Sequence, residues 1–151
     1  MIQPVPQDPD YEARVRTSFS KQSIMTTLGA VLNDVQPGQV RIILPVASHI
    51  CQQHGFVHAG AVATIADSAA GYAALSLMPQ GAGVLTTEFK INLMAPATGD
   101  CLVAEGRVIR SGRTLSVAMT EVFAQTGETR KLVALLTASM MTITGRDGIS
   151  D

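Results

Sequence analysis

The side chains that could do chemistry gather in one segment of the sequence, between Gln52 and Asp67. An alanine-rich stretch with little charge covers residues 59–78 and predicts a buried helix that Pro79 ends. Ala59 and Gly60 would lie at the start of this helix, where backbone N–H groups lack intrahelical partners and carry a partial positive charge. Such a helix start can hold a developing oxyanion.

Asp67 follows Gly60 by seven residues. At about 3.6 residues per turn, this spacing returns to the same helix face, roughly two turns further in. Its neighbours Val62, Ile65 and Ala66 are apolar, and an unused carboxylate there would be costly. Asp67 is therefore a candidate nucleophile or general base for acyl transfer. The alternative is a structural carboxylate that binds the backbone of a neighbouring loop.

The other polar residues of the segment have simpler alternatives. His58 is expected to cap the helix or bind a loop carbonyl rather than to act in catalysis. His54 is expected to be a solvated loop residue, and Gln52 could either orient a reactant or fill the loop. The three histidines have no acidic or thiol partners at metal-ligand spacing, so no metal site is predicted.

The whole chain, residues 1–151, predicts a single α+β domain. It is 46% hydrophobic and 15% charged, which is enough to build a core. Residues 1–10 carry three prolines and predict a flexible arm. Periodicity predicts helices over 11–25 and 59–78 and strands over 40–46, 85–93, 102–108, 115–124 and 131–144. One face of the strand over 85–93 is expected to carry Leu85, Thr87, Phe89, Ile91 and Leu93.

The segment from Gln52 to Asp67 resembles the active-site signature of the PaaI-type hot-dog thioesterases, a family of aryl- and acyl-CoA thioesterases. The matches are Gln52, Gly55, His58 and Gly60, with Asp67 nine residues after the histidine. Further similarity runs in order over 84–96, 99–100, 104–108, 110–113 and 131–134. The resemblance implies the hot-dog fold, an antiparallel sheet wrapped around one long central helix.

The resemblance also implies roles for these residues. Asp67 would attack the thioester carbonyl or activate a water, and would act across a subunit boundary. The N–H of Ala59, with that of Gly60, would bind the thioester oxygen, and Gln52 would orient the water or the carbonyl. Thr86 falls where the family often has a hydroxyl near the attacking water. Ala59 replaces the usual glycine and Gln52 the commoner asparagine, which bears on substrate choice more than on reaction class.

Arginines surround a predicted hairpin turn at Arg110, Ser111, Gly112 and Arg113. Coenzyme A carries phosphates, which guanidinium groups bind in bidentate fashion and which turn N–H groups can also hold. The alternative is a merely solvated hairpin tip.

The remaining expectations concern partners and location. A net charge of −1 without charge runs indicates no nucleic-acid or membrane partner. The sequence has two cysteines, Cys51 and Cys101, and no disulfide framework is expected, which fits the reducing cytoplasm. Both faces of residues 132–143 are largely apolar, which favours burial on both sides, and the resemblance implies a homodimer and a dimer of dimers.

No cofactor is expected, because coenzyme A is part of the substrate. A medium-chain or aryl acyl group is expected. The competing functions are a non-catalytic acyl-CoA binding module and a hot-dog hydratase or dehydratase, whose His-Phe-Pro-Gly type motif is absent.

Overall fold

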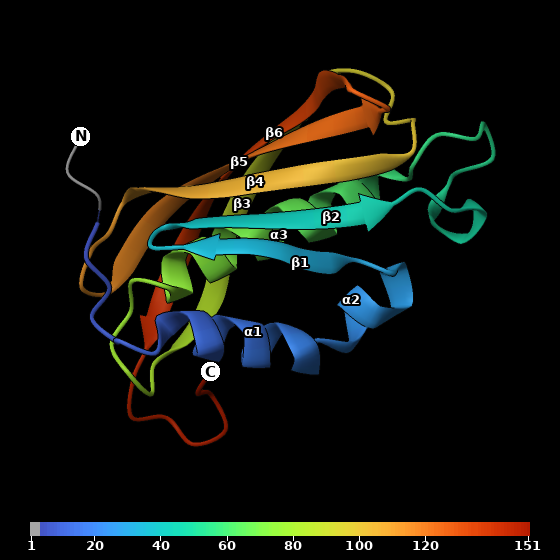
Figure 1. The fold of residues 1–151 in the computed structure, drawn as a ribbon. Coiled ribbons are helices and arrows are strands. Elements are labelled where there is room, and N and C mark those ends of the chain that lie inside the picture. The colour runs from blue at the N-terminus through green and yellow to red at the C-terminus, as the bar shows by residue number, and fades with distance from the viewer. Residues whose placement is uncertain (1–3) are drawn as a thin grey trace.

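The computed structural model describes residues 4–151. Six antiparallel strands form one sheet in the order β1-β2-β4-β5-β6-β3 (Figure 1). The strands are β1 (Val31–Gln36), β2 (Gln39–Pro45), β3 (Gly83–Leu93), β4 (Cys101–Arg110), β5 (Leu115–Thr126) and β6 (Thr129–Ile143). The helices are α1 (Tyr11–Lys21), α2 (Ser23–Leu28) and α3 (Ala59–Leu75), with a short 3-10 turn, η1, at Ser48–Ile50.

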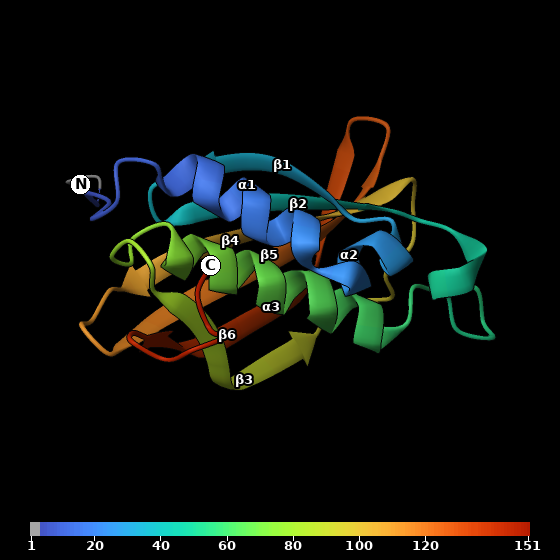
Figure 2. The ribbon, with the colours of Figure 1, turned by 90° about the horizontal axis from the view of Figure 1, so that it is seen from below.

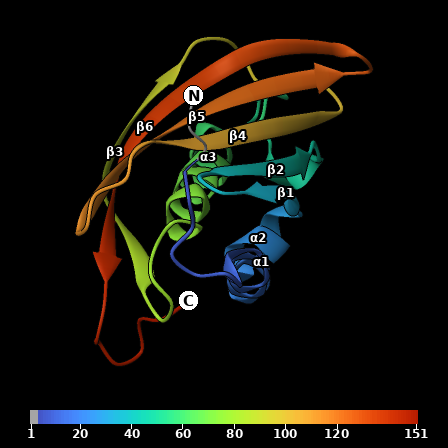
Figure 3. The ribbon, with the colours of Figure 1, turned by 60° about the vertical axis from the view of Figure 1, so that its left-hand side comes forward.

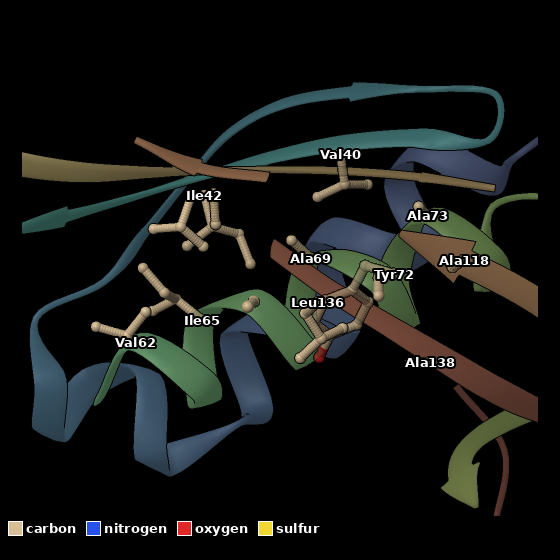
Figure 4. Packing of buried hydrophobic residues seen from close by; sticks show 14 of the residues in the cluster. Val40, Ile42, Val62, Ile65, Ala69, Tyr72, Ala73, Ala118, Leu136 and Ala138 are labelled. Atoms are coloured by element: carbon tan, nitrogen blue, oxygen red, sulfur yellow. The ribbon is translucent and has the colours of Figure 1, made fainter. Parts of the chain in front are cut away.

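The sheet curves around α3, and α1 and α2 lie beside α3 on its other side (Figures 2 and 3). Side chains of α3 such as Val62, Ile65 and Ala69 meet Val40 and Ile42 of the sheet (Figure 4). Nearly all of α3 from Ala61 to Leu75 is buried. The expected α+β architecture, one long helix held by an antiparallel sheet, is therefore confirmed.

Small residues bring α3 and the sheet into close contact. A Cβ atom at Gly106 of β4 would lie under 3.0 Å from the backbone of Ala69 and Ala70. Thr120 of β5, which pairs with Gly106, donates its hydroxyl to the Ala66 carbonyl at 2.8 Å. The alanine-rich sequence of α3 thus fixes the distance of the helix from the sheet, and with it the position of Asp67.

Several local predictions need correction. β1 was not predicted, and it forms a hairpin with β2 through Pro37 and Gly38. The predicted helix over 11–25 is two helices, and α3 ends at Leu75 rather than at residue 78. The outer face of β6 is partly open, with Leu132 37% exposed.

The predicted face of β3 holds for Phe89, Ile91 and Leu93 but not for Leu85, because a bulge lies between Thr86 and Glu88. Leu85 pairs with Met141, whereas Phe89 pairs with Ala138. These partners lie an odd number of residues apart on β6, so the two β3 side chains point to opposite faces.

The N-terminal segment contacts the end of α3. Arg14 donates to the carbonyls of Leu75, Met78 and Pro79 at 2.7, 3.0 and 2.7 Å. Buried Asp8 pairs with Arg14 at 3.1 Å, and Gln7 donates to the Leu77 carbonyl. The Leu75 carbonyl at the end of α3 and the carbonyls of the turn that follows it therefore have donors that the helix cannot supply. Residues 1–3 lie outside the described part of the chain.

Within residues 4–151, the helices are too short or too polar to cross a membrane.

Gly106→Ala should destabilise the fold by about 1–3 kcal/mol, because the added methyl group overlaps the backbone of α3. Gly71→Ala is the matched control. Its methyl group would meet only Met140 Sδ at 4.0 Å, and alanine favours a helix by up to about 1 kcal/mol over glycine. Denaturant unfolding of both variants measures the difference, and equal stabilities would contradict the proposed close contact.

Candidate active site

The structure has a large cavity at the start of α3. Its volume is about 500 Å³. Most of its lining is apolar, and its polar members come from the loop that precedes the helix. The lining residues are Gln52, Gln53, Phe56, Val57, His58, Ala59, Val62, Leu93, Met94, Ala95, Pro96, Ala97 and Val133.

His58 caps α3, as one of its two sequence-based alternatives predicted. Its Nδ1 accepts a hydrogen bond from the Gly60 N–H at 2.8 Å. This bond requires Nδ1 to be unprotonated, so the neutral ring carries its proton on Nε2. A Cβ atom at Gly60 would lie 3.1 Å from His58 Nδ1. The missing side chain at Gly60 therefore makes room for the capping imidazole.

Ala59 carries the free donor at this helix start. Ala61 and Val62 donate to the His58 carbonyl, and Gly60 donates to the His58 ring. No residue between 4 and 151 accepts a hydrogen bond from the Ala59 N–H. The Gly60 N–H, which the sequence predicts as a second oxyanion donor, is engaged by the His58 ring in this structure. The Ala59 N–H is thus the donor at this helix start that remains available within the described chain.

Gln52 lines the same cavity from the loop before α3. Its Oε1 accepts a hydrogen bond from the His54 N–H, and its backbone exchanges bonds with Phe56 and Gly55. Gly55 has φ +85°, a conformation that favours glycine. The side-chain nitrogen of Gln52 has no partner in the described chain, so its two N–H donors remain available.

Asp67 and Thr86 meet at a second, smaller cavity of about 110 Å³. Thr86 of β3 donates its hydroxyl to Asp67 Oδ1 at 2.8 Å and also contacts Met140 Sδ at 3.3 Å. Burial raises the pKa of the half-buried Asp67 carboxyl, and the Thr86 hydrogen bond lowers it in part. Thr86 stands beside the β3 bulge, which sets where its hydroxyl points.

Five further polar residues line this cavity that sequence reasoning missed: Ser18, Gln22, Ser68, Tyr72 and Asp151. Tyr72 lies five residues after Asp67 on the same helix, a spacing that does not place two side chains on one face. Ser18, Gln22 and Asp151 come from distant parts of the chain, and only the tertiary fold brings them to α3 (Figure 2).

Within one chain the candidate groups form three separate sets. Asp67 lies eight residues after Ala59, which is about 12 Å along a helix at about 1.5 Å per residue. The arginine hairpin, residues 110–113, follows β4 and lies at the end of the sheet where β3 begins. It lines neither cavity. The start of α3 lies at the other end of β3, near Leu93. The 11 residues of β3 span roughly 33 Å.

The hairpin itself is exposed at Arg110, Ser111 and Arg113. The Gly112 N–H donates to Ser116 Oγ at 3.4 Å, so it is not free for a phosphate. A Cβ at Gly112 would overlap the Leu115 carbonyl, which explains the glycine. In the described chain, no three His, Cys, Asp or Glu side chains lie close enough to hold a metal ion.

Asp67→Asn should raise the melting temperature at pH 7. The folded-state pKa of Asp67 is raised, so folding becomes less favourable as the pH rises through that pKa and the carboxyl ionises in its buried position. Asparagine keeps an acceptor for Thr86 without the charge. The gain should shrink as the pH falls toward about 4, the ordinary carboxyl range. Asp147→Asn, at an exposed position, is the control, and no gain at pH 7 would refute this account.

His58→Ala should lower the free energy of unfolding by about 0.5–2 kcal/mol, because the Gly60 N–H loses its cap. His58→Asn should keep most of the stability, since asparagine is a good N-cap. Denaturant unfolding checks both. Equal losses in the two variants would mean that the hydrogen bond contributes nothing.

Comparison with known proteins agrees with this architecture. Residues 54–131 match the thioesterase superfamily. A curated relative from Halobacterium salinarum, whose name places it among the esterases, is 30% identical over 118 residues, which cover 75% of this chain and 78% of the relative.

Two solved structures extend the similarity. A thioesterase family protein from Silicibacter pomeroyi is 44% identical with a TM-score of 0.86, over 88% of this chain and 98% of that one. The PaaI protein of E. coli, from the phenylacetic acid degradation operon, is 21% identical with a TM-score of 0.80, over 91% and 96% of the two chains, and shares the fold. The chain belongs to the thioesterase superfamily, with the hot-dog fold of PaaI-type proteins, and is a thioester hydrolase.

Proposed function

We propose that this enzyme hydrolyses an acyl-CoA thioester at a site built from two copies of the chain. The observation that carries the proposal is the separation of two groups on one rigid helix. The free Ala59 N–H and the Asp67 carboxylate lie about 12 Å apart along α3. An oxyanion donor and an attacking group must both lie within about 3 Å of the reacting atoms. One chain therefore supplies Asp67, and its partner supplies the helix start.

The edge strand β3 supports this pairing. In the described chain it bonds on one side only, to β6. Phe89, Leu93 and Met94 are 47%, 52% and 50% exposed at or just beyond this edge. Exposed apolar edge strands tend to pair with another chain. A two-fold axis across β3 reverses the partner strand, which brings the Thr86 end of one chain toward the Leu93 end of the other.

Asp67 then attacks the thioester carbonyl carbon directly or removes a proton from a water that attacks it. In either case the carbonyl oxygen becomes an oxyanion, which accepts a hydrogen bond from the partner's helix start at Ala59. Collapse of the tetrahedral intermediate breaks the carbon–sulfur bond and releases coenzyme A as a thiolate. A raised pKa makes Asp67 a stronger base than an ordinary aspartate. Direct attack by Asp67 forms an anhydride that water then hydrolyses.

The neighbouring side chains assist this step. The free amide nitrogen of Gln52 is positioned at the helix-start cavity and orients the water or the carbonyl. Thr86 holds one oxygen of Asp67 through its hydroxyl and so directs the other toward the substrate. His58 acts through the cap that it provides for Gly60 and is a positioning residue.

The cavity at the start of α3 and the arginine hairpin accommodate the rest of the substrate. At about 500 Å³, the cavity has room for the pantetheine arm, and its apolar lining favours a medium-chain or aryl acyl group. Arg110 and Arg113 bind the phosphates of coenzyme A from the exposed hairpin. Hydrolysis uses water and needs no cofactor. We place the enzyme in the cytoplasm, where coenzyme A esters are found, as a homodimer that pairs into a tetramer.

Asp67→Ala and Asp67→Asn should abolish thiol release from acyl-CoA substrates. The measurement is a thiol-release screen with phenylacetyl-, benzoyl-, short-chain and medium-chain acyl-CoA. A non-catalytic binding module would instead show a thermal shift with coenzyme A and no turnover across the panel. Unchanged turnover in both Asp67 variants would refute the role of this carboxylate.

Ala59→Pro should lower turnover by about 10²–10³, the usual effect of losing one oxyanion donor. Proline lacks the N–H but is well tolerated at the first position of a helix. The preceding residue, His58, has φ −60° and ψ 139°, which suits a residue before proline. Ala59→Ser keeps the N–H and is the control. Full activity in the proline variant with an intact fold would exclude this N–H from the site.

A further inference from the structure

The cavity beside Asp67 is small and mostly polar, and the proposed mechanism uses only Asp67 and Thr86 from its lining. Its volume of about 110 Å³ exceeds the roughly 30 Å³ that one water molecule takes up. The acyl group and the pantetheine arm are placed in the larger, apolar cavity at the start of α3. The polar cavity is therefore free to hold water next to the carboxylate.

We propose that Gln22 is a further catalytic residue, whose side-chain amide nitrogen holds the attacking water against the free oxygen of Asp67. The proposal rests on the proposed function and follows the route in which Asp67 removes a proton from water. Gln22 and Asp67 come from the same chain, and the thioester carbonyl is bound at the helix start of the partner.

Gln22 occupies the break between α1 and α2, and hydrogen bonds from both helices fix its backbone. Its N–H donates to the Phe19 carbonyl at 3.0 Å, and its carbonyl accepts from the Met25 N–H at 3.0 Å. Both helices lie beside α3 (Figure 2), where the Phe19 ring packs against Tyr72 with the ring centroids 5.9 Å apart. The side chain of Gln22 therefore starts from a defined position next to α3.

One hydrogen bond to α3 determines which end of the Gln22 amide faces the cavity. Ser68 donates its hydroxyl to Gln22 Oε1 at 3.1 Å. Because Oε1 is engaged with the helix, Nε2 is the end that remains, and it has no acceptor within residues 4–151. Ser68 directly follows Asp67 in the sequence of α3. The same bond therefore brings the free donor of Gln22 close to the carboxylate, in the cavity that both residues line.

The Asp67 carboxylate has one oxygen without a partner. Its Oδ1 accepts from the Thr86 hydroxyl at 2.8 Å, and its Oδ2 has no donor among the described residues. Water can reach both Oδ2 and Gln22 Nε2, because in the described chain only Arg14 Nε is a side-chain polar atom that is both buried and unpartnered. A water molecule can therefore accept from Nε2 and donate to Oδ2, which leaves a lone pair for the thioester carbon.

The two partners of this water have different tasks in the reaction. As the water oxygen bonds to the carbonyl carbon, one proton of the water moves to Asp67 Oδ2. When the carbon–sulfur bond breaks, Asp67 returns this proton to the sulfur of coenzyme A, and the acid leaves with the water oxygen. Gln22 transfers no proton and only orients the lone pair. Loss of its N–H should therefore slow the chemical step without weakening substrate binding.

The test removes this donor and, separately, the bond that orients it. Gln22→Met keeps the length of the side chain without an N–H, whereas Ser68→Ala removes the bond to Oε1 and leaves the N–H in place. With the best substrate of the thiol-release screen, Gln22→Met should lower kcat by about tenfold with little change in KM, the effect of one lost hydrogen bond. Ser68→Ala should lower kcat by less than about threefold. It should have no further effect in the Gln22→Met protein, because it acts through Gln22.

A crystal structure of the wild-type protein supplies a measurement that does not depend on turnover or on the folding of a variant. It should show a water within about 3.2 Å of both Gln22 Nε2 and Asp67 Oδ2. The crystal structure of the Gln22→Met protein should lack this water. Ser23→Ala, at an exposed position of the same junction, is the control and should leave kcat unchanged.

The outcomes separate a catalytic role from a structural one. Both Gln22→Met and Ser68→Ala remove the hydrogen bond between Gln22 and Ser68, so equal losses of kcat would mean that this bond, and not the free donor, matters. Unchanged kcat in Gln22→Met, or the absence of the water from the wild-type crystal, would also overturn the proposal. A wild-type protein that holds the water but releases no thiol from any acyl-CoA refutes the proposed function while supporting the water site.

Discussion

One rigid helix fixes the distance between the oxyanion donor and the acid, and the rest of the structure depends on that constraint. The Ala59 N–H marks the start of α3, and Asp67 lies about 12 Å further along it. Because Gly106 and Thr120 hold α3 directly against the sheet, neither group can move toward the other. A site that needs both must take them from two helices, and an exposed β3 edge offers the place where two helices can meet.

The carboxylate of Asp67 also shows how the fold balances stability against chemistry. Burial raises its pKa, and one hydroxyl, from Thr86, partly offsets that cost. Buried groups with unfavourable energetics persist where function needs them. His58 and Arg14 act at the two ends of the same helix, where they satisfy N–H and carbonyl groups that α3 leaves unpaired. The helix is thus held at both ends, and its middle carries the half-buried Asp67 carboxyl group.

Sequence reasoning found α3, the His58 cap alternative and the candidate Asp67 from helical spacing and local motifs, and the candidate Thr86 from the family resemblance. It could not find what depends on tertiary contacts. The β3 bulge shifts Leu85 to the other face without any glycine or proline to signal it. The strand β1 is short and mixes apolar with polar residues, and its pairing with β2 defines it. Sequence spacing also does not show that the Gly60 N–H binds the His58 ring. Nor does it show that Asp151 lies beside α3.

The most direct test of the two-chain site is complementation between two inactive variants. Ala59→Pro chains keep Asp67, and Asp67→Asn chains keep the Ala59 N–H. When the two are unfolded together and refolded in equal amounts, half of the dimers contain one chain of each kind, and each of these has one intact site. A two-chain site therefore predicts recovery of about a quarter of the wild-type thiol release. If the mixture stays as inactive as either variant alone, although mixed dimers are present, both groups act within one chain and the account is wrong.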